Sequence, residues 1–194
     1  MGELIDAIIF ATKKHQGQVR KGAKHLPYMT HPLAVAQLII EIGKVHDRDT
    51  LTAAILHDTI EDTITTPEEI SKLFGEEVLR IVLEVSDNKS LPREVRKKLQ
   101  VEHAPELSYP ARLIKWGDKI DNCRDILNDP PEDWSLKRLQ NYIQWGFDVL
   151  AKIRGTNASL ESTFDKLVRK AEKELEFTIK EFGSINERPW APEK

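Results

Sequence analysis

The stretch AAILHDTIED (residues 53–62) decides the fold of this chain and points to its chemistry. It opens with four apolar residues, which predicts a buried helix, and it then places His57, Asp58, Glu61 and Asp62 within six residues. Burying such groups is costly unless they are paired or bound to a metal. On one continuous helix, residues four apart share a face, so His57 would lie above Glu61 and Asp58 above Asp62. The stretch therefore predicts a helix that carries a polar or metal-binding site into the core.

Two further segments have the same character. The segment YMTHP (residues 28–32) puts His31 at the start of a helix, and LIKWGDKIDN (residues 113–122) puts Asp118 into a partly apolar helix. In isolation each feature has an ordinary structural explanation, because His31 could be a satisfied helix-start residue and Asp118 could pair with a nearby base. Their occurrence in one chain together with residues 53–62 favours a shared site.

Two imidazoles and two carboxylates form a mixed nitrogen and oxygen set, which suits divalent ions such as Mn²⁺, Fe²⁺, Co²⁺, Ni²⁺ or Zn²⁺. Glu61 and Asp62 follow one turn later and are candidates to orient a water molecule or to transfer protons, although they could also be the solvated end of a helix. The expected metal ligands are His31, His57, Asp58 and Asp118.

Composition limits the class of protein. The chain has 194 residues, a net charge of −3 and a sequence pI near 6.1, so it does not have the strong basic charge of a general nucleic-acid binder. It contains one cysteine, Cys123, and no apolar run near the roughly 20 residues that span a bilayer. We expect a soluble, cytoplasmic protein whose partner is a small molecule, neither a nucleic acid nor a membrane.

Helical periodicity dominates, and strand signals are weak. We expect a single all-α domain over residues 1–194, with a core at about 3–155, a C-terminal helix at about 159–182 and an irregular tail at 186–194. Thr30 and Thr66 are expected helix caps, and residues 16–27 are expected to form a loop. The expected helices span about 3–16, 30–42, 48–61, 67–75, 76–87, 92–105, 109–127, 135–153 and 159–182.

The last expected helix carries an apolar stripe that could pack on its own domain or on a second copy of the chain. We favour the first arrangement and leave a homo-oligomer open. The stripe consists of Leu160, Phe164, Leu167, Val168, Ala171, Leu175 and Ile179.

The order H…HD…D resembles the HD phosphohydrolase superfamily. HQGQVRKGAKHLPYMTHP (15–32), ILHDTIEDT (55–63), VSDNKSLP (85–92) and KWGDKIDNCRDI (115–126) are similar to motifs of the RelA/SpoT-type alarmone hydrolases, over roughly residues 3–150. The resemblance implies an HD-domain bundle of about eight to ten helices. It also implies Mn²⁺-dependent hydrolysis of the 3′-diphosphate of guanosine tetra- or pentaphosphate (ppGpp or pppGpp), which releases pyrophosphate and GDP or GTP. We expect a stand-alone hydrolase, without the synthetase and regulatory domains of long members.

By this resemblance, the four expected ligands bind the metal, and Glu61 and Asp62 are the catalytic pair. Arg20 would lie against the guanine, because a guanidinium stacks well on a planar base. Further cations are available for the phosphates, although residues 93–98 could be only the solvated face of a helix, and the expected nucleoside contact Tyr142 could be core. The expected substrate-binding residues are Arg20, Lys21, Lys89, Arg93, Lys97, Asn122 and Tyr142.

Two departures from the family pattern, residues 24–26 and Asp121, lie near the expected nucleotide pocket and leave the substrate open. One alternative is an HD phosphatase acting on another 2′- or 3′-phosphorylated nucleotide, such as NADPH or an adenosine analogue. A second alternative is a non-catalytic nucleotide-binding module. The presence of both Glu61 and Asp62 argues against the second, because a binder would need neither.

Overall fold

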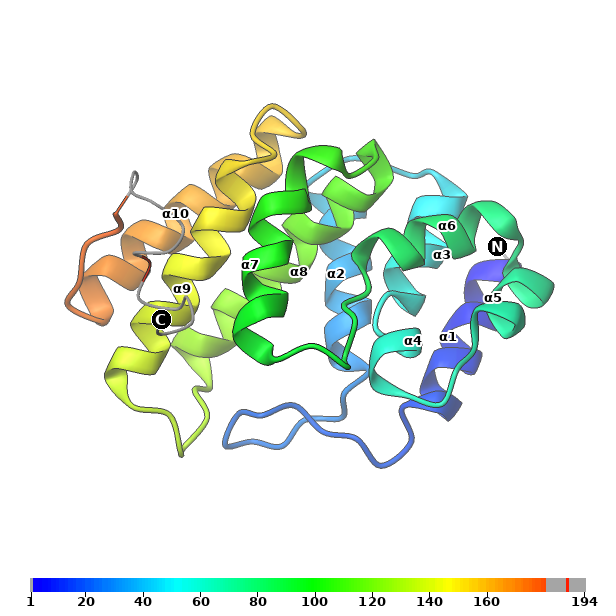
Figure 1. Cartoon of the computed structure of the whole chain (residues 1–194), viewed down its shortest axis with the longest axis horizontal. Coiled ribbons are helices and arrows are strands. Elements are labelled where there is room, and N and C mark those ends of the chain that lie inside the picture. The colour runs from blue at the N-terminus through cyan, green and yellow to red at the C-terminus, as the bar shows by residue number, and fades with distance from the viewer. Residues whose placement is uncertain (1, 181–187, 189–194) are drawn as a thin grey trace.

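The computed structural model describes residues 2–180 and residue 188, and this part of the chain is all-α, as expected (Figure 1). Its one β feature is an isolated bridge between Val19 and Pro27 in the loop after the first helix. None of its helices is long and apolar enough to cross a membrane. The helices are α1 (Gly2–Lys14), α2 (Thr30–Glu41), α3 (Arg48–Leu56), α4 (Thr59–Asp62), α5 (Pro67–Phe74), α6 (Glu76–Val85), α7 (Arg93–His103), the 3₁₀ turn η1 (Ala104–Glu106), α8 (Tyr109–Asn128), α9 (Leu136–Ala151) and α10 (Ala158–Glu174).

Helix α8 is the centre of the bundle. It contacts α2, α3, α6, α9 and α10, and Figure 1 shows α1, α3, α5 and α6 on one side of it and α9 and α10 on the other. Its apolar residues Leu113, Ile114, Trp116 and Ile120 are completely buried or nearly so. Because α2 and α8 pack closely, His31 at the start of α2 comes to lie opposite Asp118 in the middle of α8.

The helix ends follow local sequence signals in most places. Thr66 and Glu69 form the expected capping box, in which each side chain accepts a hydrogen bond from the backbone of the other residue. The cap expected at Thr30 was wrong. Met29 occupies that position, and the Thr30 hydroxyl donates instead to the carbonyl of Pro27, 2.8 Å away.

The helix expected over residues 48–61 is interrupted at His57 and Asp58, so the prediction of one continuous helix was wrong. Nδ1 of His57 lies 2.8 Å from the Ala54 carbonyl, and the Thr59 hydroxyl donates to the Leu56 carbonyl at 2.7 Å. Side-chain donors thus occupy carbonyls that a continuous helix would offer to backbone N–H groups. The break, and not a shared helix face, sets the direction of the His57 and Asp58 side chains.

The C-terminal helix ends at Glu174 and not near residue 182, so that boundary was also wrong. Glu176 adopts φ 51°, and the N–H of Phe177 donates back to the carbonyl of Glu172, which is a helix-terminating turn. The chain then runs along α9, where Lys180 and the side chain of Gln144 exchange two hydrogen bonds. The tail expected at 186–194 lies outside the described residues except for residue 188.

The apolar stripe of α10 packs on its own domain, as we favoured. Leu160, Phe164 and Ala171 are completely buried, and α10 contacts α8 and α9. The ring of Phe164 meets the ring of Trp116 on α8 edge to face at 5.9 Å.

Candidate active site

A single pocket of about 640 Å³ runs from the α2–α4 side of α8 to α7 and α9. Every residue that the sequence predicted for the site lines it. These residues are His31, His57, Asp58, Asp118, Glu61, Asp62, Arg20, Lys21, Lys89, Arg93, Lys97, Asn122 and Tyr142.

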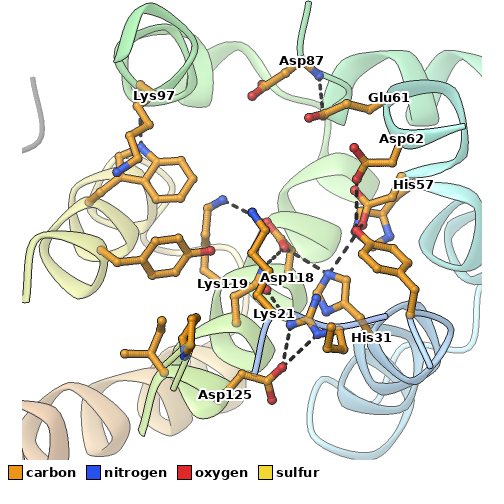
Figure 2. Close-up of a pocket in the computed structure, with 18 of the residues that line it drawn as sticks. Lys21, His31, His57, Glu61, Asp62, Asp87, Lys97, Asp118, Lys119 and Asp125 are labelled. Atoms are coloured by element: carbon orange, nitrogen blue, oxygen red, sulfur yellow. Dashed lines mark hydrogen bonds and ion pairs between the residues drawn. The ribbon is translucent and has the colours of Figure 1, made fainter. Parts of the chain in front are cut away.

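The two imidazoles lie at the inner end of the pocket, and both are buried (Figure 2). Because His57 uses Nδ1 to donate to the Ala54 carbonyl, its Nε2 carries a free lone pair. This Nε2 is buried and has no hydrogen-bond partner among the described residues, and it lies 3.1 Å from Oδ2 of Asp58. Nε2 of His31 lies 3.4 Å from Oδ1 of Asp118 and 3.7 Å from Oδ2 of Asp58.

The donor atoms at this end fit a divalent cation. Ligand atoms of His31, His57 and Asp118 all lie within 4.8 Å of one another, and a carboxylate oxygen of Asp58 faces both rings. A buried imidazole nitrogen with no hydrogen-bond partner is rare and costly. A cation between the nitrogen and the carboxylates would remove that cost, so His57 Nε2 is the observation that points to a metal.

Charge favours a cation at the same point. Burial alone would lower the pKa of His31, but its hydrogen bonds to Asp118 and Asp121 outweigh burial and raise this pKa to about 9. Burial would raise the pKa of Asp118, but nearby Lys119 and His31 hold it well below its usual range. Ionised carboxylates therefore surround a point where positive charge is stabilised.

Tyr28 is a site residue that the sequence analysis did not single out. Its hydroxyl lies 2.6 Å from Oδ2 of Asp58 and 3.1 Å from Oδ2 of Asp62, so it joins an expected ligand to the expected catalytic pair. Its ring stacks on His15 at 4.6 Å. The sequence signal was present, since Tyr28 lies three residues before His31 in the same motif.

Glu61 lies beyond Asp62, toward Asp87 (Figure 2). One of its carboxylate oxygens accepts a hydrogen bond from the backbone N–H of Asp87 at 2.9 Å, and the other lies 3.4 Å from the guanidinium of Arg96. Burial raises the pKa of Glu61, and the carboxylate of Asp87 adds to this, although the Asp87 N–H opposes it. Lys89 forms ion pairs with both Glu61 and Asp62, so it lies directly beside the expected catalytic pair.

The outer end of the pocket is cationic and aromatic. Nζ of Lys97 lies 5.0 Å from the Trp145 ring and 5.8 Å from the Tyr142 ring, and the guanidinium of Arg93 lies 5.8 Å from the Trp134 ring. Burial, together with the positive charge of Arg93, lowers the pKa of Lys97 to about 7. A merely solvated helix face was the alternative explanation for residues 93–98, and three of these residues line the pocket: Arg93, Arg96 and Lys97.

Arg20 and Asn122 connect the two ends. The guanidinium of Arg20 donates to Oδ1 of Asn122 at 2.7 Å and to Oδ2 of Asp125 at 2.9 Å. The amide of Asn122 in turn donates to Asp118. Arg20 is therefore held in place by α8, and its partner Asp125 was not identified from the sequence.

An all-α bundle that gathers His, His-Asp and Asp in this chain order around a cation-sized point defines the class of metal-dependent His-Asp hydrolases. The family model described as HD domain matches residues 7–156, and the chain belongs to this family.

Proteins named guanosine-3′,5′-bis(diphosphate) 3′-pyrophosphohydrolase MESH1 are similar to this chain. The one from Xenopus tropicalis is 47% identical over 164 residues, which are 84% of this chain and 92% of that protein. The one from Homo sapiens is 43% identical, over 86% and 93% of the two chains. A solved structure titled as a metazoan ortholog of SpoT that hydrolyses ppGpp superposes with a TM-score of 0.86 at 38% identity, over 88% of this chain and 96% of that one.

Proposed function

We propose that this protein hydrolyses the 3′-diphosphate of ppGpp and pppGpp, releasing pyrophosphate and GDP or GTP. The observation that carries the proposal is the pocket's two-ended chemistry. Nε2 of His57 has no hydrogen-bond partner among the described residues and lies at an acidic end, while the other end offers cations and aromatic rings. The names of the similar proteins from Xenopus tropicalis and Homo sapiens support this substrate.

The proposed ligands are the two imidazoles and two carboxylates of the inner end, and the proposed ion is Mn²⁺, which the donor types admit and the family resemblance favours. When bound there, a divalent cation polarises a phosphoryl oxygen and lowers the pKa of water. The proposed ligands are His31, His57, Asp58 and Asp118.

Glu61 and Asp62 are the proposed catalytic pair. Asp62 shares the Tyr28 hydroxyl with the proposed ligand Asp58, so its carboxylate is close enough to the ligands to orient water and accept its proton. The water oxygen joins phosphorus, the bond from phosphorus to the 3′-oxygen breaks, and the 3′-oxygen takes up a proton. Glu61, whose pKa burial raises, is suited to supply that proton.

The remaining predicted residues have proposed roles in binding. Arg20 presents its guanidinium to the base, with Asn122 and Tyr142 on the nucleoside, while Lys21, Arg93 and Lys97 meet phosphate charge. Lys89 is proposed to neutralise the catalytic carboxylates that it pairs with. We also propose a cytoplasmic location, which the free, buried thiol of Cys123 fits.

The test is a substrate panel with the purified, Mn²⁺-loaded protein. We expect ppGpp to have a higher kcat/KM than NADPH or 3′-phosphorylated adenosine nucleotides. The ratio of the kcat/KM values measures how strongly the protein discriminates between these substrates. Asp58→Ala should abolish turnover. A higher kcat/KM for NADPH would favour the alternative phosphatase, and nucleotide binding with no turnover of any substrate would favour the non-catalytic module.

A further inference from the structure

We infer that Asp121 is a positioning residue that fixes the ring of His31 so that Nε2 faces the metal. This inference rests on the proposed metal site and assigns its support on α8. Nδ1 of His31 lies 2.6 Å from Oδ2 of Asp121, which is the shortest contact that either imidazole of the site makes. Asp121 lies one turn of α8 beyond Asp118, so one helix supplies both the proposed ligand and the support of its neighbour.

A neutral imidazole carries one proton, on either Nδ1 or Nε2. With the proton on Nδ1 and donated to Asp121, Nε2 keeps its lone pair and points toward Asp118 and Asp58, at 3.4 and 3.7 Å. With the proton on Nε2, the lone pair of Nδ1 would face the Asp121 carboxylate at 2.6 Å, and Nε2 could not bind a metal. The carboxylate of Asp121 therefore selects the tautomer that the site needs.

The two imidazoles are oriented by different means. His57 donates from Nδ1 to a backbone carbonyl, that of Ala54, which no substitution removes. His31 depends on a side chain, and a carboxylate acceptor makes an imidazole a more basic ligand than a carbonyl does. The support of His31 is thus the one that a single substitution can test.

A role of Asp121 in holding Arg20 is the competing explanation. The guanidinium of Arg20 lies 3.8 Å from Asp121 but 2.8 Å from Asp125, so Asp125 is its main partner. From its sequence position, Asp121 was expected near the nucleotide pocket, but its nearest partner, His31, lies on the metal side. Asp125 is also on α8 and also pairs with Arg20, and within the described part of the chain it makes no hydrogen bond or ion pair with His31, so it is a matched control.

The experiment compares Mn²⁺ affinity, measured by competition with a chelating dye on metal-free protein, for wild type, Asp121→Asn, Asp121→Leu and Asp125→Asn. Loss of such a supporting carboxylate weakens metal binding by about 10- to 100-fold. We expect this loss for Asp121→Leu and a smaller one for Asp121→Asn, whose amide oxygen still accepts from Nδ1. Asp125→Asn should bind Mn²⁺ like wild type but show a raised KM.

A second readout is the tautomer of His31, read from the ¹⁵N shifts of its ring in the metal-free protein at a pH at which the ring is neutral. The wild type should show the proton on Nδ1, and Asp121→Leu should show a mixture. Asp121→Asn decides the question if Asp121→Leu does not fold. Wild-type Mn²⁺ affinity in both Asp121 variants would overturn this inference alone, whereas no Mn²⁺ binding by the wild type would overturn the metal site as well.

Discussion

The two ends of the pocket have opposite chemistry. The inner end, built from α2, the α3–α4 break and α8, gathers carboxylates and imidazoles that favour a positive charge between them. The outer end, built by α7 and α9, gathers Lys97 and Arg93 against aromatic rings and favours a negative one. Each end therefore suits a ligand of opposite sign, a cation at the inner end and an anion at the outer end.

A polyphosphorylated nucleoside with a divalent cation balances both ends at once. Its ring can lie against Arg20, and its phosphates can extend from the cation to the lysines. The same division of charge predicts that substitutions at the inner end change kcat, while those at the outer end change KM.

The largest effect is expected for His57→Ala. This change removes the buried Nε2, which has no hydrogen-bond partner in the part of the chain that the structure describes. Because a catalytic metal supplies several kcal/mol and about 1.4 kcal/mol is tenfold in rate, kcat should fall by roughly 1000-fold or more. Mn²⁺ titration and pyrophosphate release measure the change. Undiminished Mn²⁺ binding would show that His57 is not a metal ligand.

Glu61→Gln should have the next largest effect. The amide keeps the shape of the side chain but cannot carry the proton, so kcat should fall roughly 10²- to 10⁴-fold. Mn²⁺ affinity should be unchanged, since Glu61 pairs with Asp87, Arg96 and Lys89 and, among the described residues, forms no hydrogen bond or ion pair with a proposed ligand. Equal losses of Mn²⁺ binding and kcat would show that Glu61 acts through the metal.

At the outer end, Lys97→Met should raise KM by roughly tenfold or more, since a charged hydrogen bond is worth about 1.5–3 kcal/mol. The pH dependence follows from the pKa of Lys97, which is lowered to about 7 by burial and by its cationic neighbours Arg93 and Lys119. Lys97 is charged below this pH and neutral above it, so wild-type kcat/KM for the anionic substrate should fall as pH rises through about 7.

This fall should be absent in Lys97→Met and present in a matched control, Lys98→Met. Lys98 lies next to Lys97 on α7, outside the pocket, and pairs with Glu102. A pH profile that is the same in Lys97→Met and in wild type would contradict the assigned role of Lys97.

The smallest effect is expected where α2 and α8 meet. A Cβ added at Gly117 would lie 2.9 Å from Cγ1 of Val35 and 3.2 Å from its backbone oxygen. Overpacking costs about 1–3 kcal/mol, and replacing a helical glycine returns about 1 kcal/mol. Gly117→Ala should therefore lower the free energy of unfolding by about 1 kcal/mol in urea denaturation of the metal-free protein. A higher free energy of unfolding for Gly117→Ala would mean that α2 and α8 can move apart at this contact without cost.

The all-α class and most helix bounds could be predicted because apolar periodicity and capping residues are local signals. The break after Leu56 could not be, because it depends on side chains of His57 and Thr59 that take backbone carbonyls. The end of α10 was missed because its apolar pattern continues through Leu175 and Ile179 after the helix has stopped.

The predicted site residues do line one pocket. They could be predicted because each motif itself contains ionisable residues of the site. The residues that support them were missed, since Tyr28, Asp121 and Asp125 act through contacts between distant segments. Asp121 lies 90 residues from His31, and nothing in its local sequence indicates that its carboxylate meets that ring.

The most direct test of the central claim is pyrophosphate release from ppGpp by the metal-stripped protein, before and after Mn²⁺ is added. The account predicts no release before addition, and after it stoichiometric formation of GDP and pyrophosphate. Turnover by the metal-stripped protein at the same rate, or no turnover of ppGpp with Mn²⁺ bound, would contradict it.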